Sequence, residues 1–430
     1  MAKLTKAQTQ KRTNASSKTR AASSNASRAI TAPKAPPFAP AIYVQRLARL
    51  IDVAQKLDAD HLLVTSPVDV AYLTGFLGGD SYALVPLGSD ARSSQTKGGS
   101  ASRATIISDF RFGEELEPQR KFCNVEMRNG PMSKGLERVL GACKARRIVV
   151  QNESLTLSQR DMILKAAQAA NSGAKLVEST GLVAGLRIIK DASEVALIRA
   201  AVRIQEAALE ATLATITPKS IAQGLRECDI AATLEWEMKR RGSSAPAFES
   251  IVAAGATGSL PHYRPGTRKL RAKDTLLIDW GATFMGYRSD MTRTFGIGGG
   301  LDAPKRGTNV MRDIYRITLE AHHRAVAMLG PGASTREVDA AARDHITQAG
   351  YGERFGHSLG HGIGLNVHEG PSLSHIAEPT TLRPGMIVTI EPGIYLPGVG
   401  GVRLENDYLI TESGAENLCK LEMGLDWASR

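Results

Sequence analysis

Apolar residues recur at different spacings along the chain, and the changes in spacing divide it into three regions. Residues 1–40 show neither helical nor strand-type periodicity. In residues 43–57 apolar side chains follow helical spacing, and four β-type runs come after them, at 61–65, 82–87, 104–109 and 147–150. Strands that alternate with helices predict an α/β domain over residues 41–183. The Gly/Ser-rich residues 88–103 predict a long hairpin loop between two of its strands.

A different pattern begins near residue 184, where longer amphipathic segments are separated and followed by β-type runs. A helix is predicted to open at Asp191, and others cover about 221–241, 308–328 and 335–348. The β-type runs lie at 250–255, 275–279, 292–295, 386–390 and 402–404. Helices that flank a mostly antiparallel, curved sheet predict an α+β architecture for residues 184–430, rather than a doubly wound one.

The net charge is concentrated at one end of the chain. Residues 1–40 contain five Lys, three Arg and no acidic residue, so they carry +8 of the formal net charge of +11 and leave +3 for the rest. A segment of this composition cannot bury a core, and we expect a disordered basic tail. A nearly neutral body does not indicate a nucleic-acid-binding domain, so contact with nucleic acid is expected only as non-specific attraction to the tail.

The cysteines and the apolar runs bear on the compartment. The four cysteines are scattered without ligand spacing and are expected to be reduced thiols in the cytoplasm. No apolar run is long enough to cross a membrane. Residues 1–40 lack the apolar segment of a secretory signal, but their Arg/Ser-rich, acid-free composition also resembles an organelle transit peptide. That alternative stays open.

Five residues that can ligate a metal occur in order in the second half of the chain. Their contexts are Leu-Ile-Asp279-Trp-Gly, Tyr-Arg-Ser-Asp290-Met-Thr, Leu-Gly-His361-Gly-Ile, Thr-Ile-Glu391-Pro-Gly and Val-Arg-Leu-Glu405-Asn-Asp. Such a set offers more ligands than one ion needs, and it suits two divalent ions held close together by bridging carboxylates. Because an unpaired buried carboxylate is costly, acids that directly follow apolar β-type runs are poorly explained as surface residues.

The spacing of the four acids is consistent with paired strands. Asp279 and Asp290 are eleven residues apart around Gly286, so two strands joined by a short turn would bring both carboxylates together. Glu391 and Glu405 repeat the arrangement fourteen residues apart. A donor set rich in carboxylates and free of thiolates favours Mn²⁺, although Co²⁺, Zn²⁺ or Fe²⁺ can occupy the same ligands.

Three of the nine histidines, His357, His361 and His368, fall within twelve residues of a Gly-rich segment. Histidines four residues apart on a helix can bind zinc, as in peptidases with an HExxH motif. Here the glycines between them disfavour a regular helix, and the glutamate of that motif is absent. The segment therefore does not predict a peptidase of that type.

The five ligand segments resemble those of the pita-bread metallopeptidases, the family of methionine aminopeptidase, aminopeptidase P, prolidase and creatinase. The segment Asp69-Val-Ala-Tyr-Leu-Thr-Gly-Phe is similar to the amino-terminal domain of creatinase, prolidase and aminopeptidase P, which methionine aminopeptidase lacks. The resemblance implies that residues 184–430 form a pita-bread catalytic domain, preceded by a creatinase/prolidase-type domain. Such a fold has two pseudo-symmetric halves with the metals between them.

The resemblance also implies roles for individual residues. Asp279 would ligate one ion, His361 and Glu391 would complete the other, and Asp290 and Glu405 would bridge both. His262, in Leu-Pro-His-Tyr-Arg, and His368, in Val-His-Glu-Gly-Pro, match histidines on the substrate side, and Glu391 is also the expected proton shuttle. Positions near the substrate are also matched by His357, Tyr395 and Arg403, and for the last two a structural role is equally compatible with the pattern.

The function implied by this resemblance is hydrolysis of the Xaa-Pro bond in proline-containing peptides, by an aminopeptidase P or a prolidase, and a homodimer is expected. The sequence does not separate the two activities. A creatinase-type enzyme does not fit the intact metal set. The remaining alternatives are a pita-bread hydrolase with another substrate and a catalytically silent binding protein, although silent relatives have lost metal ligands.

Overall fold

The computed structural model describes residues 38–88, 103–302 and 310–429. Most of the expected tail and nearly all of the expected Gly/Ser loop lie outside these ranges. Phe38, within the segment assigned to the tail, is 8% exposed, and its ring lies 5.9 Å from that of Tyr43 and 6.1 Å from that of Tyr287. Residues 38–40 therefore belong to the folded body, and Pro40 begins the first helix, where its fixed φ is favourable.

The N-terminal domain is built on one mixed sheet of six strands, in the order β4-β3-β2-β1-β5-β6. Its strands are β1 (His61–Val64), β2 (Tyr82–Pro86), β3 (Thr105–Asp109), β4 (Asn124–Arg128), β5 (Arg147–Gln151) and β6 (Lys175–Ser179). Its helices are α1 (Pro40–Ala54), α2 (Pro67–Thr74), α4 (Met132–Ala142), α5 (Leu157–Ala170) and α6 (Leu182–Arg187). The last of these runs across the boundary expected at residue 183 and ends at Arg187. Along β1, Leu62 and Val64 pack into one core and Leu63 into another, so both faces of the sheet are covered.

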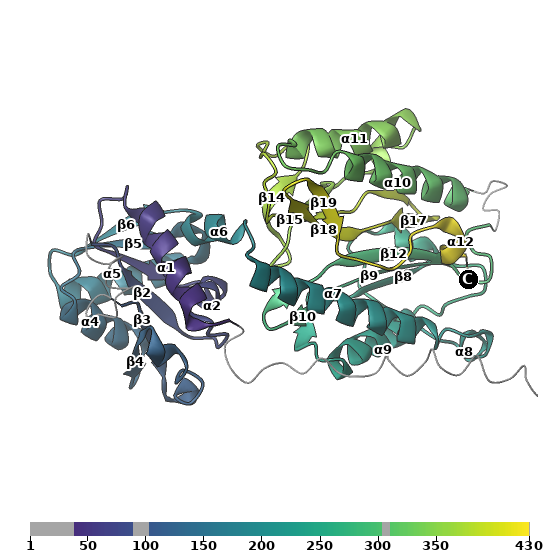
Figure 1. Cartoon of the computed structure of the whole chain (residues 1–430). Helices are drawn as coiled ribbons and strands as arrows, with labels where there is room; N and C mark the ends of the chain where they lie inside the picture. The colour runs from purple at the N-terminus through teal and green to yellow at the C-terminus, as the bar shows by residue number, and fades with distance from the viewer. Residues whose placement is uncertain (1–37, 89–102, 303–309, 430) are drawn as a thin grey trace, which may run out of the picture.

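The C-terminal half places antiparallel strands between two pairs of helices (Figure 1). One pair is α7 (Ala192–Leu213) with α9 (Glu227–Arg240), extended by the short α8 (Pro218–Ala222), and the other is α10 (Val310–Ala327) with α11 (Thr335–Gln348). The chain ends with α12 (Leu425–Ala428). The strands are β7 (Ala245–Pro246), β8 (Ile251–Ala254), β9 (Thr275–Trp280), β10 (Ala282–Phe284), β11 (Tyr287–Arg288), β12 (Met291–Gly296), β13 (Gly360–Gly362), β14 (Glu369–Leu373), β15 (Ile387–Ile390), β16 (Gly393–Leu396), β17 (Gly400–Arg403), β18 (Asn406–Thr411) and β19 (Gly414–Asn417).

The single helix expected over 221–241 is wrong. The chain leaves α8 after Ala222, and Gly224 adopts φ +89°, a left-handed conformation that glycine tolerates and a helix does not. Arg226 then forms an isolated bridge with Lys269, and α9 begins one residue later. The interruption directs the first turn of α9 toward the segment that follows β8.

The two halves of this domain repeat one topology. β9 pairs antiparallel with β12, and a separate hairpin of β10 and β11 lies between them in sequence. In the same way β15 pairs antiparallel with β18, with the hairpin of β16 and β17 between them. The expectation of neighbouring strands is confirmed, but each connection is a hairpin of its own rather than a short turn.

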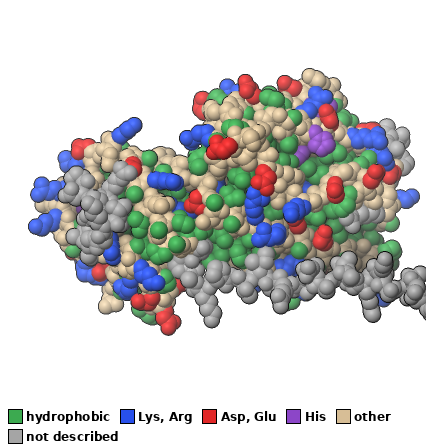
Figure 2. All heavy atoms as spheres, in the orientation of Figure 1, with side chains coloured by type: hydrophobic (Ala, Val, Ile, Leu, Met, Phe, Trp, Pro, Cys, Tyr) green, Lys and Arg blue, Asp and Glu red, His purple; other side chains and the backbone are tan. Residues whose placement is uncertain are grey.

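Charges are mixed over the body. On the face shown in Figure 2, Lys and Arg side chains are interspersed with Asp and Glu, and hydrophobic side chains lie between them. This pattern accords with the small net charge left once residues 1–40 are set aside. Among the described residues, no helix is both long and apolar enough to cross a membrane.

Candidate metal centre

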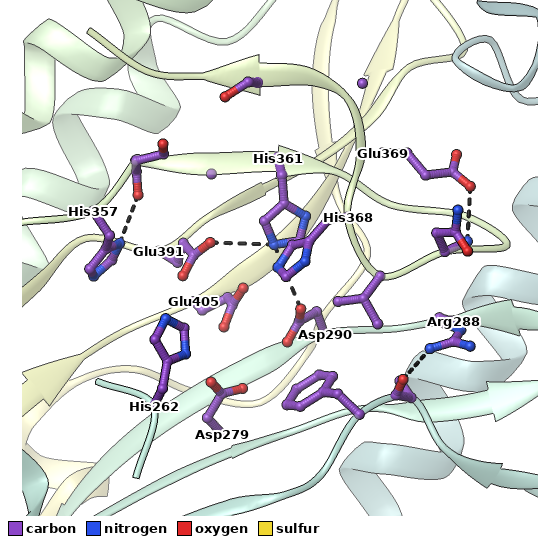
Figure 3. A pocket seen from close by; sticks show the side chains of 18 of the residues that line it. His262, Asp279, Arg288, Asp290, His357, His361, His368, Glu369, Glu391 and Glu405 are labelled. Atoms are coloured by element: carbon purple, nitrogen blue, oxygen red, sulfur yellow. Dashed lines mark hydrogen bonds and ion pairs between the residues drawn. The ribbon is translucent and has the colours of Figure 1, made fainter. Parts of the chain in front are cut away.

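The ends of paired strands bring four acidic side chains together (Figure 3). Asp279 lies on β9 directly opposite Thr292, and Asp290 immediately precedes β12. Glu391 immediately follows β15, and Glu405 precedes β18 with its backbone N–H donating to the carbonyl of Thr292 at 3.2 Å. Residues separated by more than 100 positions thus converge because the two strand pairs of the repeat meet.

The fifth expected ligand, His361, lies on β13 rather than on a helix. Its Nε2 is 3.4 Å from a carboxylate oxygen of Glu391 and 3.8 Å from one of Asp290. Its Nδ1 lies 3.0 Å from the carbonyl of Gly362, which favours the tautomer that leaves the Nε2 lone pair free. Burial, with a contribution from His368, lowers the pKa of His361 to about 4, so the imidazole is neutral and able to ligate.

The residues present fit a divalent metal. Asp290, His361 and Glu405 each bring one ligand atom within 4.8 Å of the others. One oxygen of Asp279 and one of Asp290 are buried without a hydrogen-bond partner among the described residues. Burial and then the neighbouring acids raise the pKa of Asp290 and of Glu405 well above their ordinary values. A cation would satisfy the unpaired oxygens and relieve the repulsion between the acids.

Arg403 and Tyr395, which were expected on the substrate side, are buried and contact each other, and Arg403 also contacts one of the expected ligands. The guanidinium of Arg403 donates to Asp279 at 2.5 Å, to the hydroxyl of Thr292 at 3.0 Å and to that of Tyr395 at 2.7 Å. Thr292 in turn donates to Glu405 at 2.6 Å. Arg403 therefore orients Asp279 directly and Glu405 through Thr292. His357 lines the cavity with Nε2 2.9 Å from the hydroxyl of Tyr395, and burial lowers the pKa of His357 to about 4.

His262 and His368 lie beside the acids on the cavity wall, and both are exposed. The His368 ring stands 4.3 Å from that of His361, edge to face. Neither His262 nor His368 shows a hydrogen bond to another described residue, so their ring nitrogens are available to a ligand. The cavity has a volume of about 1130 Å³ and is lined by both domains, with Ser66 and Glu153 among the residues from the first.

Sequence reasoning missed Glu227, which holds the segment that carries His262. Its buried carboxylate accepts hydrogen bonds from the backbone of Ala254 at 2.8 Å, the hydroxyl of Thr257 at 2.7 Å and the hydroxyl of Tyr263 at 2.8 Å. The signal available in the sequence was weak. An acid in the first turn of a helix is ordinarily a solvated residue that interacts favourably with the helix dipole.

The buried oxygen-rich cluster, set between strand pairs of a pseudo-symmetric α+β domain, defines a metal-dependent hydrolase. The chain matches the model of metallopeptidase family M24 over residues 196–412 and that of the creatinase/prolidase N-terminal domain over residues 46–189. The chain belongs to metallopeptidase family M24, and the expected pita-bread fold and metallopeptidase class are confirmed.

Relatives support this assignment along most of the chain. An uncharacterized peptidase, YqhT, of Bacillus subtilis is 34% identical over 369 residues, which cover 86% of this chain and 96% of that protein. The Xaa-Pro dipeptidase of Pyrococcus furiosus is 43% identical over 244 residues, or 57% of this chain and 66% of that protein. The solved structure of an Xaa-Pro dipeptidase from Bacillus anthracis aligns with a TM-score of 0.77 at 34% identity, covering 90% of this chain and 99% of that one.

Proposed function

We propose that this chain is an Xaa-Pro peptidase, which hydrolyses the amide bond before proline in short peptides. The observation that carries the proposal is the convergence of four acids and one imidazole on a cavity, with two buried carboxylate oxygens left unpaired. The substrate class is supported by the relatives whose printed names are Xaa-Pro dipeptidase or prolidase. Aminopeptidase P and prolidase activity both stay within the proposal.

We assign the site to two divalent ions, and its carboxylate-rich donor set favours Mn²⁺. Asp279 would hold one ion, His361 and Glu391 the other, and Asp290 and Glu405 would be shared. When bound, the ions would supply a water of lowered pKa and a Lewis acid for the peptide carbonyl. Metal content after purification tests both the number and the identity of the ions.

The remaining roles belong to side chains on the cavity wall. His262 and His368 have uncommitted ring nitrogens, which we assign to hydrogen bonds with the oxygen of the scissile carbonyl as it gains negative charge. Glu391 is partly exposed to the cavity, and we assign it to carry a proton to the departing nitrogen. That proton is essential, because a bond before proline releases a secondary amine.

One cavity arginine favours substrates with a free carboxylate. Arg187, Arg264 and Arg403 each form an ion pair, with Asp69, Glu249 and Asp279 respectively. Arg288 forms no ion pair among the described residues. Its backbone-directed Nη1 donates to the carbonyl of Ala247, while its buried Nε has no partner. Glu369 is the charged neighbour that acts on Arg288 electrostatically, but it forms no ion pair with it. A half-buried guanidinium with no anion in contact suits the carboxylate of a dipeptide, and this favours the dipeptidase over an enzyme for longer peptides.

Three further properties are proposed from the sequence. The scattered, unpaired cysteines support a cytoplasmic location, and the family resemblance supports a homodimer. Attraction to nucleic acid is proposed to be non-specific and confined to the basic residues 1–40. Sedimentation velocity of the full chain, with and without added polyanion at two salt concentrations, tests the last two.

The deciding experiment compares four substrates with the purified full chain and Mn²⁺. Ala-Pro should be cleaved, and Ala-Ala should not. Cleavage of Ala-Pro-Ala as fast as Ala-Pro would favour aminopeptidase P, and slower cleavage of Ala-Pro-amide would support the carboxylate contact. The Asp290→Asn variant is the matched control for contaminating peptidases. Failure to cleave any Xaa-Pro substrate with metal bound would refute the proposed function.

A further inference from the structure

A buried ionic network joins the N-terminal domain to the loop that carries His368. Arg187, the last residue of α6, donates to Asp69 of α2 at 2.6 Å and pairs on its other side with Glu369 at the start of β14. Lys190 lies 3.2 Å from the second oxygen of Glu369. The four charged side chains are only 1–6% exposed, so water does not weaken these contacts.

The network is balanced and continues into the first domain. It holds two acids and two bases, and the second oxygen of Asp69 accepts a hydrogen bond from the Gln151 side chain at 2.6 Å. Burial alone would raise the pKa of Glu369, but Lys190 and Arg187 outweigh it and lower that pKa. Glu369 is therefore an anion held by two cations, and loss of either partner would leave a buried charge uncompensated.

The same carboxylate closes the loop on which His368 lies. One oxygen of Glu369 accepts the backbone N–H of Asn366 at 2.9 Å. The carboxylate also lies against Gly364, where a Cβ would come within 2.8 Å of it. The other side of the loop is attached to β11, because the Gly364 carbonyl accepts the backbone N–H of Arg288 at 2.8 Å. The Glu369 side chain thus closes residues 364–369 in addition to the backbone pairing of Glu369 with Gly362 between β13 and β14, and His368 lies inside the closed segment.

We propose that Glu369 is a positioning residue for His368. The docked N-terminal domain then helps to fix the position of His368 beside the metal centre, through contacts of Asp69 with Arg187 and of Arg187 with Glu369. Arg187 and Lys190 hold the carboxylate, the carboxylate closes the loop, and the loop presents the imidazole beside His361. The inference rests on the proposed role of His368 in binding the scissile carbonyl. A hydrogen-bond donor displaced by about 1 Å costs on the order of 100-fold in rate, so a small shift of this loop matters.

A double-mutant cycle separates positioning from simple support of the fold. The Glu369→Gln variant should lower kcat for Ala-Pro by about 10- to 100-fold while bound metal and KM stay unchanged. In a His368→Ala background the same substitution should have no further effect on kcat. Glu416→Gln is the matched control, because Glu416 pairs with Arg199 at the exposed surface and leaves the loop intact. It should not change kcat in either background.

Two kinetic outcomes would overturn the proposal. One is an unchanged kcat in Glu369→Gln, and the other is an equal loss in both backgrounds, which would mark a purely structural contact. If Glu369→Gln does not fold, Asp69→Asn enters the same cycle with a smaller expected loss. Histidine-selective NMR gives a reading independent of substrate. The His368 resonance is identified as the signal that is missing in His368→Ala, and it should shift in Glu369→Gln. An unchanged His368 resonance would contradict the proposal, even if no Xaa-Pro peptide were cleaved.

Discussion

Without bound metal, the protein should lose stability as the pH rises through neutrality. The deprotonation of Glu391 is the contribution to that loss that we predict in detail. Burial is the main cause that raises the pKa of Glu391 from 4.5 to about 8, and Asp279 adds to the rise. Between those two values the folded chain keeps a proton on Glu391 that the unfolded chain has released. The free energy of unfolding therefore falls with rising pH in this window.

The size of the effect follows from the pKa difference. Each pKa unit corresponds to about 1.4 kcal/mol, and the interval from pH 5 to pH 8 spans most of the shift. Glu391 should thus account for a loss of about 3–4 kcal/mol over that interval. Other buried groups contribute with either sign: burial lowers the pKa of His322 to about 3 and raises that of Asp407 to about 8. The comparison must therefore isolate Glu391.

The assay is urea unfolding of chelator-treated wild type and Glu391→Gln at pH 5, 6, 7 and 8. The glutamine carries no titrating proton, so the wild type should lose about 3–4 kcal/mol relative to the variant across the series. Saturating Mn²⁺ should remove the wild-type loss, because bound metal takes the place of the proton. Parallel pH profiles for the two metal-free proteins, or a wild type that gains stability relative to the variant, would refute the reasoning.

Four further predictions concern an expected ligand, two cavity residues and the N-terminal segment. Asp290→Ala should abolish bound metal and activity together, and two retained ions with near-normal turnover would contradict the assignment. His368→Ala should lower kcat by about 100- to 1000-fold with metal content unchanged. If plasma mass spectrometry shows that the variant has also lost metal, His368 is a metal ligand instead. Phe38→Ala should cost about 3 kcal/mol of folding stability, whereas deletion of residues 2–37 should leave thermal stability and kcat/KM unchanged. A truncated chain that unfolds at ordinary salt would show that those residues contribute to the fold. Arg288→Ala should erase a preference for Ala-Pro over Ala-Pro-amide, and a preserved preference would remove Arg288 from substrate binding.

The sequence by itself determined the five candidate ligands and their order. Asp279 and Glu391 come at the ends of short apolar runs, and local periodicity was enough to place such acids on paired strands. The same local rules predicted the helices that became α10 and α11 to within about two residues. They failed at Gly224. Helical periodicity continues across 221–241, but the left-handed backbone of this one glycine interrupts the helix. Periodicity reports which face a residue occupies, and it does not report where the chain bends.

Only the tertiary structure decided how the candidate ligands are held. Arg403 meets Asp279 across 124 residues, Thr292 meets Glu405 across 113, and Arg187 meets Glu369 across 182. Such pairs form where separately folded strand pairs and domains come together, and no spacing along the chain encodes them. Contacts within a few residues depend on local geometry, which a sequence pattern records. Buried ion pairs between distant elements depend on the packing of the whole core, so they appear only once the chain is folded.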